Sequence, residues 1–131
     1  MIESQAARLA ATRANDKEIQ DLVNLHRQLV QATEDDDIDR DGDCDRQFYS
    51  VLAGAAQNTY LAEVIPRIFN LPLRLWFVIS ERVGGWHDIA RAHEEMTQSV
   101  ADAISRRDPD EAELAIKIYV HRRHQDIREF L

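Results

Sequence analysis

The sequence contains a single cysteine, three prolines and four glycines among its 131 residues. Cys44 alone cannot form an internal disulfide, so we expect a reducing compartment. No apolar run reaches the ~18 residues that span a bilayer, and the N-terminus lacks the basic start and apolar core of a signal peptide. We therefore expect a cytoplasmic protein with no membrane partner, built from a composition that favours helix.

Positive charge and catalytic motifs are also scarce. The formal net charge is −8, and residues 34–46 carry eight acidic but only two basic side chains. Because phosphate contacts supply most non-specific affinity for nucleic acid, we expect no direct DNA contact from this chain. We interpret the basic stretch 121–128 as a solvated helix face. The absence of a nucleophile–base motif, a glycine-rich phosphate loop and a paired His/Glu cluster predicts that the protein is not an enzyme.

Helical patterns separated by short breaks make up most of the sequence. Asn15 and Asp108 are expected to cap the helices that follow them, with Pro109 in a first helical position. Pro66 is expected to kink or restart a helix. The expected helices cover residues 2–14, 16–33, a stretch from near Asp43 or Asp45 to a break near Asn58, 59–69, 73–83, 86–106 and a last one from 109. Residues 73–83 could also suit a buried strand, but a helix is preferred because no partner strand is found elsewhere in the sequence. This pattern predicts an all-α antiparallel bundle of roughly six to seven helices with short connections.

The acidic stretch 34–43 raises the question of a calcium site. Its residues match positions 1, 3, 5 and 6 of an EF-hand loop: Asp37, Asp39, Asp41 and Gly42. Position 12 is Phe48, which offers no oxygen in place of the bidentate glutamate. We interpret the stretch as a solvated connection with weak, non-specific cation association, followed by a helix that begins near Asp43 or Asp45.

That helix carries part of a family resemblance. The stretch DRQFYSVLAGAAQNTYL resembles the D-x-x-F-H-x-x-L-x-x-A-x-x-N-x-x-L pattern of the FCD domain, the effector-binding and dimerising half of FadR-branch GntR transcription regulators. The matching residues are Asp45, Phe48, Leu52, Ala55, Asn58 and Leu61. The stretches IESQAARLAATRA and SVADAISRRDPDEAELAI resemble two further patterns of the family. We expect residues 1–131 to form one FCD-like domain, with the family's N-terminal winged helix-turn-helix DNA-binding domain not present in this chain.

The resemblance implies a divalent-metal site, which many members form from one Asp and three His in the bundle core. The matching positions here are Asp45, Tyr49, Thr97 and Tyr119. Neutral phenols and hydroxyls are weak ligands for zinc or nickel, so we expect no cofactor. A metal, if bound, would be held by Asp45 and His93. We interpret His93, like His121 and His124, as a surface or edge histidine.

The same positions suggest a small-molecule site. Asp45, Tyr49, Thr97 and Tyr119 would place hydrogen-bonding groups inside an apolar bundle. Four further residues are added to the predicted pocket: Arg13, Asn58, Arg74 and His93. Either arginine could pair with a ligand carboxylate, although a surface salt bridge is the preferred interpretation of Arg74. For both tyrosines, core packing with the hydroxyl tied to a carboxylate is the alternative.

The function that the resemblance implies is effector sensing and dimerisation in a bacterial regulator. A small organic acid or acyl-type effector would bind in the bundle core of a homodimer, and a separate N-terminal domain would couple that binding to DNA. Two alternatives stay open: a ligand-free dimerisation module with a degenerate pocket, and a metal-dependent sensor that uses His93. Trp76, Phe77 and Trp86 are candidate interface or core aromatics.

Overall fold

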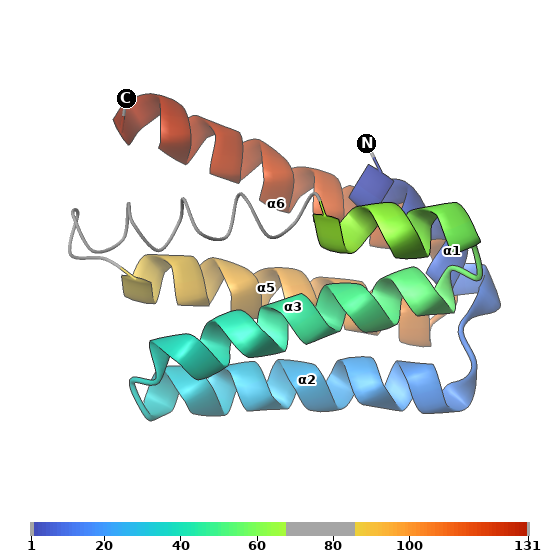
Figure 1. Cartoon of the computed structure of the whole chain (residues 1–131), viewed down its shortest axis with the longest axis horizontal. Helices are drawn as coiled ribbons and strands as arrows, with labels where there is room; N and C mark the ends of the chain where they lie inside the picture. Colours follow the sequence, from blue (N-terminus) through green and yellow to red (C-terminus); the bar gives the residue numbers. More distant parts are fainter. Residues whose placement is uncertain (1, 68–85, 131) are drawn as a thin grey trace.

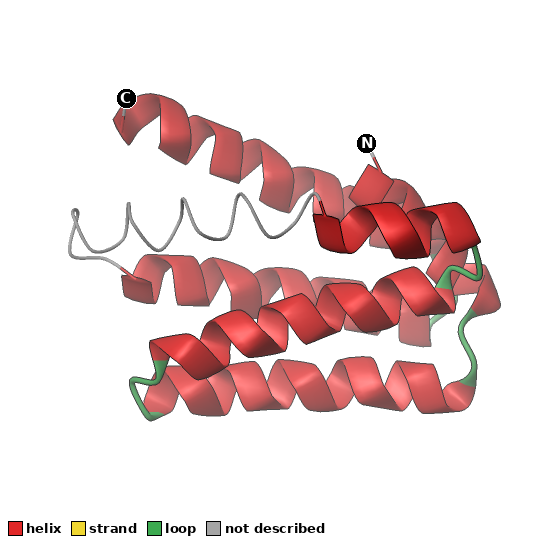
Figure 2. Ribbon diagram, viewed as in Figure 1, coloured by secondary structure: helices red, strands yellow, loops and turns green. Residues whose placement is uncertain are grey.

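The computed structural model describes residues 2–67 and 86–130, and these ranges consist of helices joined by short turns, without strands (Figure 2). The helices with defined bounds are α1 (Ile2–Arg13), α2 (Asp16–Glu34), α3 (Ile38–Ala55), α5 (Trp86–Ser105) and α6 (Pro109–Phe130). Residues 59–67 are helical as well. The predicted all-α bundle is confirmed.

Capping residues set the helix starts where the sequence predicts them. The Asn15 Oδ1 accepts a hydrogen bond from the Glu18 amide at 2.8 Å, and the Glu18 Oε1 accepts one from the Asn15 amide at 2.9 Å. This reciprocal pair satisfies two amides that the first turn of α2 leaves without helical partners. Asp108 accepts from the Glu111 amide at 3.1 Å, directly ahead of Pro109. The predicted breaks before α2 and α6 are therefore confirmed.

The third helix begins earlier than predicted. Its N-cap is Asp37, whose side chain accepts from the Arg40 amide at 3.1 Å. Acidic side chains in a first turn are stabilised by the helix dipole, so the aspartate run favours this start. The interpretation of residues 34–43 as a solvated connection is wrong, because the connection is limited to 35–37 and Asp41 is only 3% exposed. An EF-hand loop is excluded there, since Asp39 and Asp41 belong to a helix.

The helices pack around one core (Figure 1). α2 packs against α3 and α5, while α6 packs against α1 and α5. Four fully buried alanines, at 6, 7, 10 and 11, allow α1 to approach its neighbours closely. The larger core side chains come from the other helices and include Leu22, Phe48, Leu52, Val100, Ile104 and Ile116. The result is a continuous apolar interior into which the polar residues below are set.

Several expectations concern the segment between residue 67 and α5. The helix that includes Pro66 continues to residue 67. The predicted helix 73–83, the prediction for Arg74 and the aromatic residues Trp76 and Phe77 lie outside the described residues. Within the described part of the chain, no helix is long and apolar enough to cross a membrane.

Candidate functional site

A group of polar side chains is buried between α3 and α5. Asp41, Asp45 and His93 are 3%, 0% and 2% exposed. The His93 Nδ1 lies 2.7 Å from Asp41 Oδ1, and its Nε2 lies 3.5 Å from Asp45 Oδ2. Asp41 and Asp45 are four residues apart on α3, so both carboxylates face the same ring. We call these three residues the Asp–His–Asp cluster.

α6 adds an aromatic ring and a cation beside this cluster. The ring centroid of Tyr119 lies 6.0 Å from that of His93. One turn further along α6, the guanidinium carbon of Arg123 lies 4.9 Å from the Tyr119 ring centroid, a cation–π arrangement. Arg123 also donates to the Ile89 carbonyl oxygen at 3.2 Å. The cluster is thus flanked on the α6 side by a positively charged side chain.

Burial changes the pKa of the carboxyl at the centre of the cluster. Burial raises the pKa of Asp45, and the neighbouring His93 and Arg123 oppose this rise. Neither oxygen of Asp45 accepts a hydrogen bond from any part of the chain that the structure describes. A buried carboxyl without donors is costly, so such a group is expected to meet a ligand or ordered water.

The two tyrosines are neutral phenols in this setting. Tyr49 is 2% exposed and lies one turn after Asp45 on α3. Burial raises the pKa of Tyr49, and Tyr119 and Asp45 raise it further. Burial likewise raises the pKa of Tyr119, with the charge of Asp45 adding to the effect. Both hydroxyls therefore keep their protons at neutral pH.

Thr97 is buried as predicted but is engaged with another histidine. Its hydroxyl donates to the Glu94 carbonyl oxygen at 3.2 Å and lies 2.8 Å from the Nδ1 of His26 on α2. The His26 ring and the Thr97 hydroxyl therefore form a hydrogen bond whose direction depends on the tautomer of the ring. Burial lowers the pKa of His26, which favours the neutral form of the ring. His26 is a neighbour of the site that the sequence reasoning missed.

Two predicted pocket residues have structural roles away from the cluster. Arg13 is exposed and donates to the Ala56 carbonyl oxygen at 2.9 Å, at the C-terminal end of α3. The Asn58 Oδ1 accepts from the Leu61 amide at 3.1 Å and caps the helix at 59–67. The structure brings together Asp45, Tyr49, His93 and Tyr119, and it places Arg13 and Asn58 elsewhere.

Two interpretations of basic residues are wrong. His93 is not a surface or edge histidine, because it lies in phase with the core residues Ala90, Thr97 and Val100 of α5. Arg123, at 6% exposure, is not part of a solvated face, although His121 and His124 beside it are exposed as predicted. Helical spacing from known core positions is the signal that identifies such residues.

The residues present do not fit the metal that the family resemblance implies. Within residues 2–67 and 86–130, no group of three or more His, Cys, Asp or Glu is arranged to hold a metal ion. Of the four matched positions, Asp45 alone is a common ligand, and the phenols of Tyr49 and Tyr119 stay protonated. The absence of a metal cofactor remains a prediction, which the chemistry of this donor set supports.

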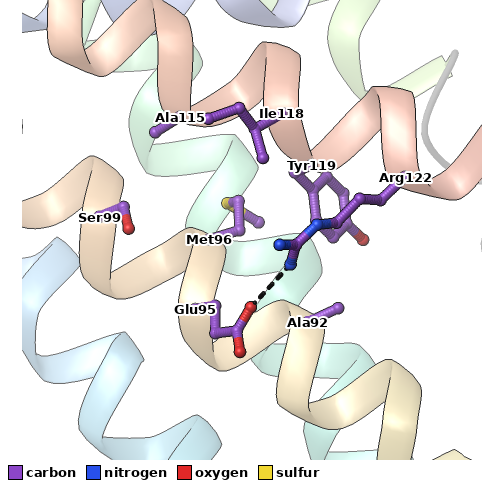
Figure 3. Close-up of a pocket in the computed structure, with 8 residues that line it drawn as sticks. All are labelled: Ala92, Glu95, Met96, Ser99, Ala115, Ile118, Tyr119 and Arg122. Carbon is purple, nitrogen blue, oxygen red and sulfur yellow. Dashed lines mark hydrogen bonds and ion pairs between the residues drawn. The ribbon is translucent and has the colours of Figure 1, made fainter.

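A groove of about 310 Å³ lies between α5 and α6 (Figure 3). Its lining residues are Ala92, Glu95, Met96, Ser99, Ala115, Ile118, Tyr119 and Arg122. An ion pair of 3.0 Å joins Arg122 to Glu95 across the groove. Tyr119 is the predicted site residue that also lines the groove, so its ring connects this surface to the buried cluster.

An all-α bundle with polar side chains gathered in its core is an architecture that accommodates small molecules between helices. A comparison with protein families matches residues 1–122 to the FCD domain, and the chain belongs to that family, the effector-binding domains of GntR-type regulators. Among solved structures, a GntR protein of Streptococcus agalactiae matches with a TM-score of 0.70 and 24% identity, over 93% of this chain and 52% of that one. The chain therefore spans about half the length of that protein. A comparison with curated proteins found no match.

Proposed function

We propose that this chain is the effector-sensing and dimerisation domain of a cytoplasmic bacterial GntR-type regulator, with the effector bound beside Asp45 in the bundle core. The observation that carries the proposal is the fully buried Asp45, whose two oxygens accept no hydrogen bond from the described residues. A ligand that donates to this carboxyl would offset the cost of its burial. Tyr49 and Tyr119 are the neighbouring groups that such a ligand would meet.

The proposed effector is a small organic acid or acyl-type compound. Arg123 provides a buried positive charge for a ligand anion, and the two phenols can donate hydrogen bonds. The raised pKa of Asp45, caused by its burial, suits a carboxyl that shares a proton with an acidic ligand. Apolar core residues such as Phe48 and Met96 would contact the hydrocarbon part.

Coupling to DNA would pass through a separate N-terminal domain. α6, which carries Tyr119 and Arg123, packs directly against α1, the first helix of the chain. A ligand that shifts α6 would therefore act on the helix to which a preceding domain connects. Such a switch requires that the ligand bind one arrangement of the bundle more tightly than the other.

A homodimer is the proposed assembly. Leu114 and Ile118 lie one turn apart on α6 and are each 48% exposed, which places two large apolar side chains side by side on the surface. Exposed apolar pairs of this kind are suited to contact with a second chain. A dimerisation module without a ligand, and a metal sensor that uses Asp45 and His93, are the alternatives.

Ligand-induced thermal stabilisation tests the proposal. The protein would be heated with a panel of short organic acids and acyl thioesters, and its unfolding midpoint recorded. We expect at least one compound to raise the midpoint, with the rise reduced in Tyr49→Phe and retained in Tyr60→Phe, whose tyrosine is 66% exposed. A response that Tyr49→Phe and Asp45→Asn both leave intact would place the effector elsewhere. A panel without any response would favour the ligand-free module.

A further inference from the structure

We propose that the positive charge of Arg123, together with His93, takes the place of the divalent metal in the polar centre of this chain. The charge of Asp45 would then be balanced within the protein, by the guanidinium of Arg123 and the ring of His93. The inference concerns the protein without effector, so it stands or falls independently of the proposed sensing role.

The electrostatic influence of Arg123 reaches the positions that match the family's metal ligands. Burial raises the pKa of Asp45, Tyr49 and Tyr119, and the charge of Arg123 opposes the rise at all three. The geometry agrees with this influence, because the guanidinium carbon lies 4.9 Å from the Tyr119 ring centroid and that ring lies 6.0 Å from the ring of His93. The guanidinium is therefore a positive charge beside the Asp–His–Asp cluster.

Arg123 is held in this place by specific contacts. It donates to the Ile89 carbonyl oxygen and stacks on the Tyr119 ring, and it is 6% exposed. Arginine stays charged at any physiological pH, so its burial requires negative charge nearby. Asp41 and Asp45 are the buried carboxyls of the described core, and the charge of Arg123 lowers the pKa of Asp45 against the effect of burial.

His93 completes the arrangement by contacting both buried carboxyls. Its Nδ1 contacts Asp41 at 2.7 Å, and its Nε2 faces Asp45 at 3.5 Å. The Nδ1 is engaged by Asp41, so Nε2 is the one ring nitrogen left to coordinate a metal, and Asp45 is the one common ligand among the four matched positions. A metal ion would in addition meet the repulsion of the Arg123 guanidinium. The site is therefore built to function without a metal.

A double-mutant cycle between Arg123 and Asp45 tests this assignment. We expect Arg123→Met to lower the unfolding midpoint in both backgrounds, but by roughly 5 °C more when Asp45 is present than when it is replaced by Asn. The reason is that Arg123→Met leaves the buried Asp45 carboxylate without its cation, whereas the asparagine carries no charge to be balanced. Arg123→Lys, which keeps the charge but loses the planar stacking group, is expected to restore most of the difference. The matched control is Arg122→Met, an exposed neighbour paired with Glu95, which should give the same small change in both backgrounds.

Equal losses for Arg123→Met in both backgrounds, with no rescue by Arg123→Lys, would overturn the proposal and leave Arg123 a packing residue. If Arg123→Met folds only in the Asp45→Asn background, the coupling is confirmed in its strongest form. If it folds in neither, Arg123→Lys decides: a folded variant whose midpoint is within ~3 °C of the unmodified protein supports the charge assignment, and any larger loss contradicts it.

Discussion

The Nδ1 of His93 and the Oδ1 of Asp41 lie 2.7 Å apart, although the two residues are 52 positions apart in the sequence. This contact joins the early part of α5 to the first turns of α3, and both side chains are almost fully buried. It explains why an aspartate in the middle of an acidic run points into the protein. Because Asp45 lies one turn after Asp41 on α3, the contact also determines where the Asp45 carboxylate meets the same imidazole.

Loss of the Asp41 carboxylate should destabilise the protein. Asp41→Asn replaces a charge-assisted acceptor of a buried hydrogen bond, and we expect the free energy of unfolding to fall by roughly 1–3 kcal/mol. Urea unfolding followed by circular dichroism measures the change. Asp39→Asn, two residues earlier and exposed on the same helix, should change it by less than ~0.5 kcal/mol. Similar values for the two variants would show that the Asp41–His93 contact contributes nothing.

Hydrogen exchange should identify residues 41–45 as a helix. The Asp41 amide donates to the Asp37 carbonyl oxygen at 3.1 Å, which is the first of the helical bonds in this stretch. We expect slow exchange for the amides of residues 42–45, with no change on addition of millimolar calcium. Fast exchange that calcium slows would instead support the loop that the acidic pattern resembles.

Asp45 predicts a particular pH dependence. Its pKa is raised by burial, so the folded state binds the proton more tightly than the unfolded chain does. The stabilisation linked to this proton is complete below the ordinary pKa of 3.8 and is lost as the pH rises through the raised value. We therefore expect the stability of Asp45→Asn relative to the unmodified protein to rise as the pH increases from acid to neutral, because the variant has no carboxyl to deprotonate.

Thermal unfolding of the two proteins across the pH range measures this difference. An Asp45→Asn variant whose loss of stability relative to the unmodified protein grows from acid to neutral pH would show that the fold stabilises the carboxylate form, which contradicts the raised pKa. The Asp39→Asn variant serves as control, since its carboxylate is exposed.

Cys44 provides a chemical test of the contact between α2 and α3. Its thiol is 2% exposed, lies 3.9 Å from Gln28 Oε1, and has a pKa raised by burial. Since the thiolate is the reactive form, we expect the folded protein to react with a disulfide reagent at least ~100-fold more slowly than the urea-unfolded chain. Rapid labelling of the folded protein would mean that α3 does not stay packed against α2.

The sequence predicts the boundaries of the helices better than the composition of the site. Asn15 with Glu18, and Asp108 with Pro109, have local chemistry that defines a helix start irrespective of what packs against it. The start of α3 is different. An aspartate run is typical both of a loop and of a first helical turn, and the burial of Asp41 decides between them.

The burial of Asp41 and Arg123 is the part that sequence reasoning missed, and His93 is included in the predicted pocket but interpreted as a surface or edge residue. Pattern analysis assigns Asp, His and Arg to the surface, because burying an unpaired charge is costly. Asp41, His93 and Arg123 are buried together, so each reduces the cost for the others. Such compensation is a property of the packed structure. The spacing of Arg123 from Ile116 and Tyr119 nevertheless marks it as a core position of α6.

Native mass spectrometry tests the central claim, that the polar centre around Asp45 works without a metal. The purified protein would be incubated with zinc or nickel, exchanged into a volatile buffer and measured next to Asp45→Asn. We expect both proteins to hold the same amount of metal, with no ion bound tightly through Asp45. One divalent ion per chain in the unmodified protein, absent from Asp45→Asn, would contradict the account and restore the metal-dependent sensor.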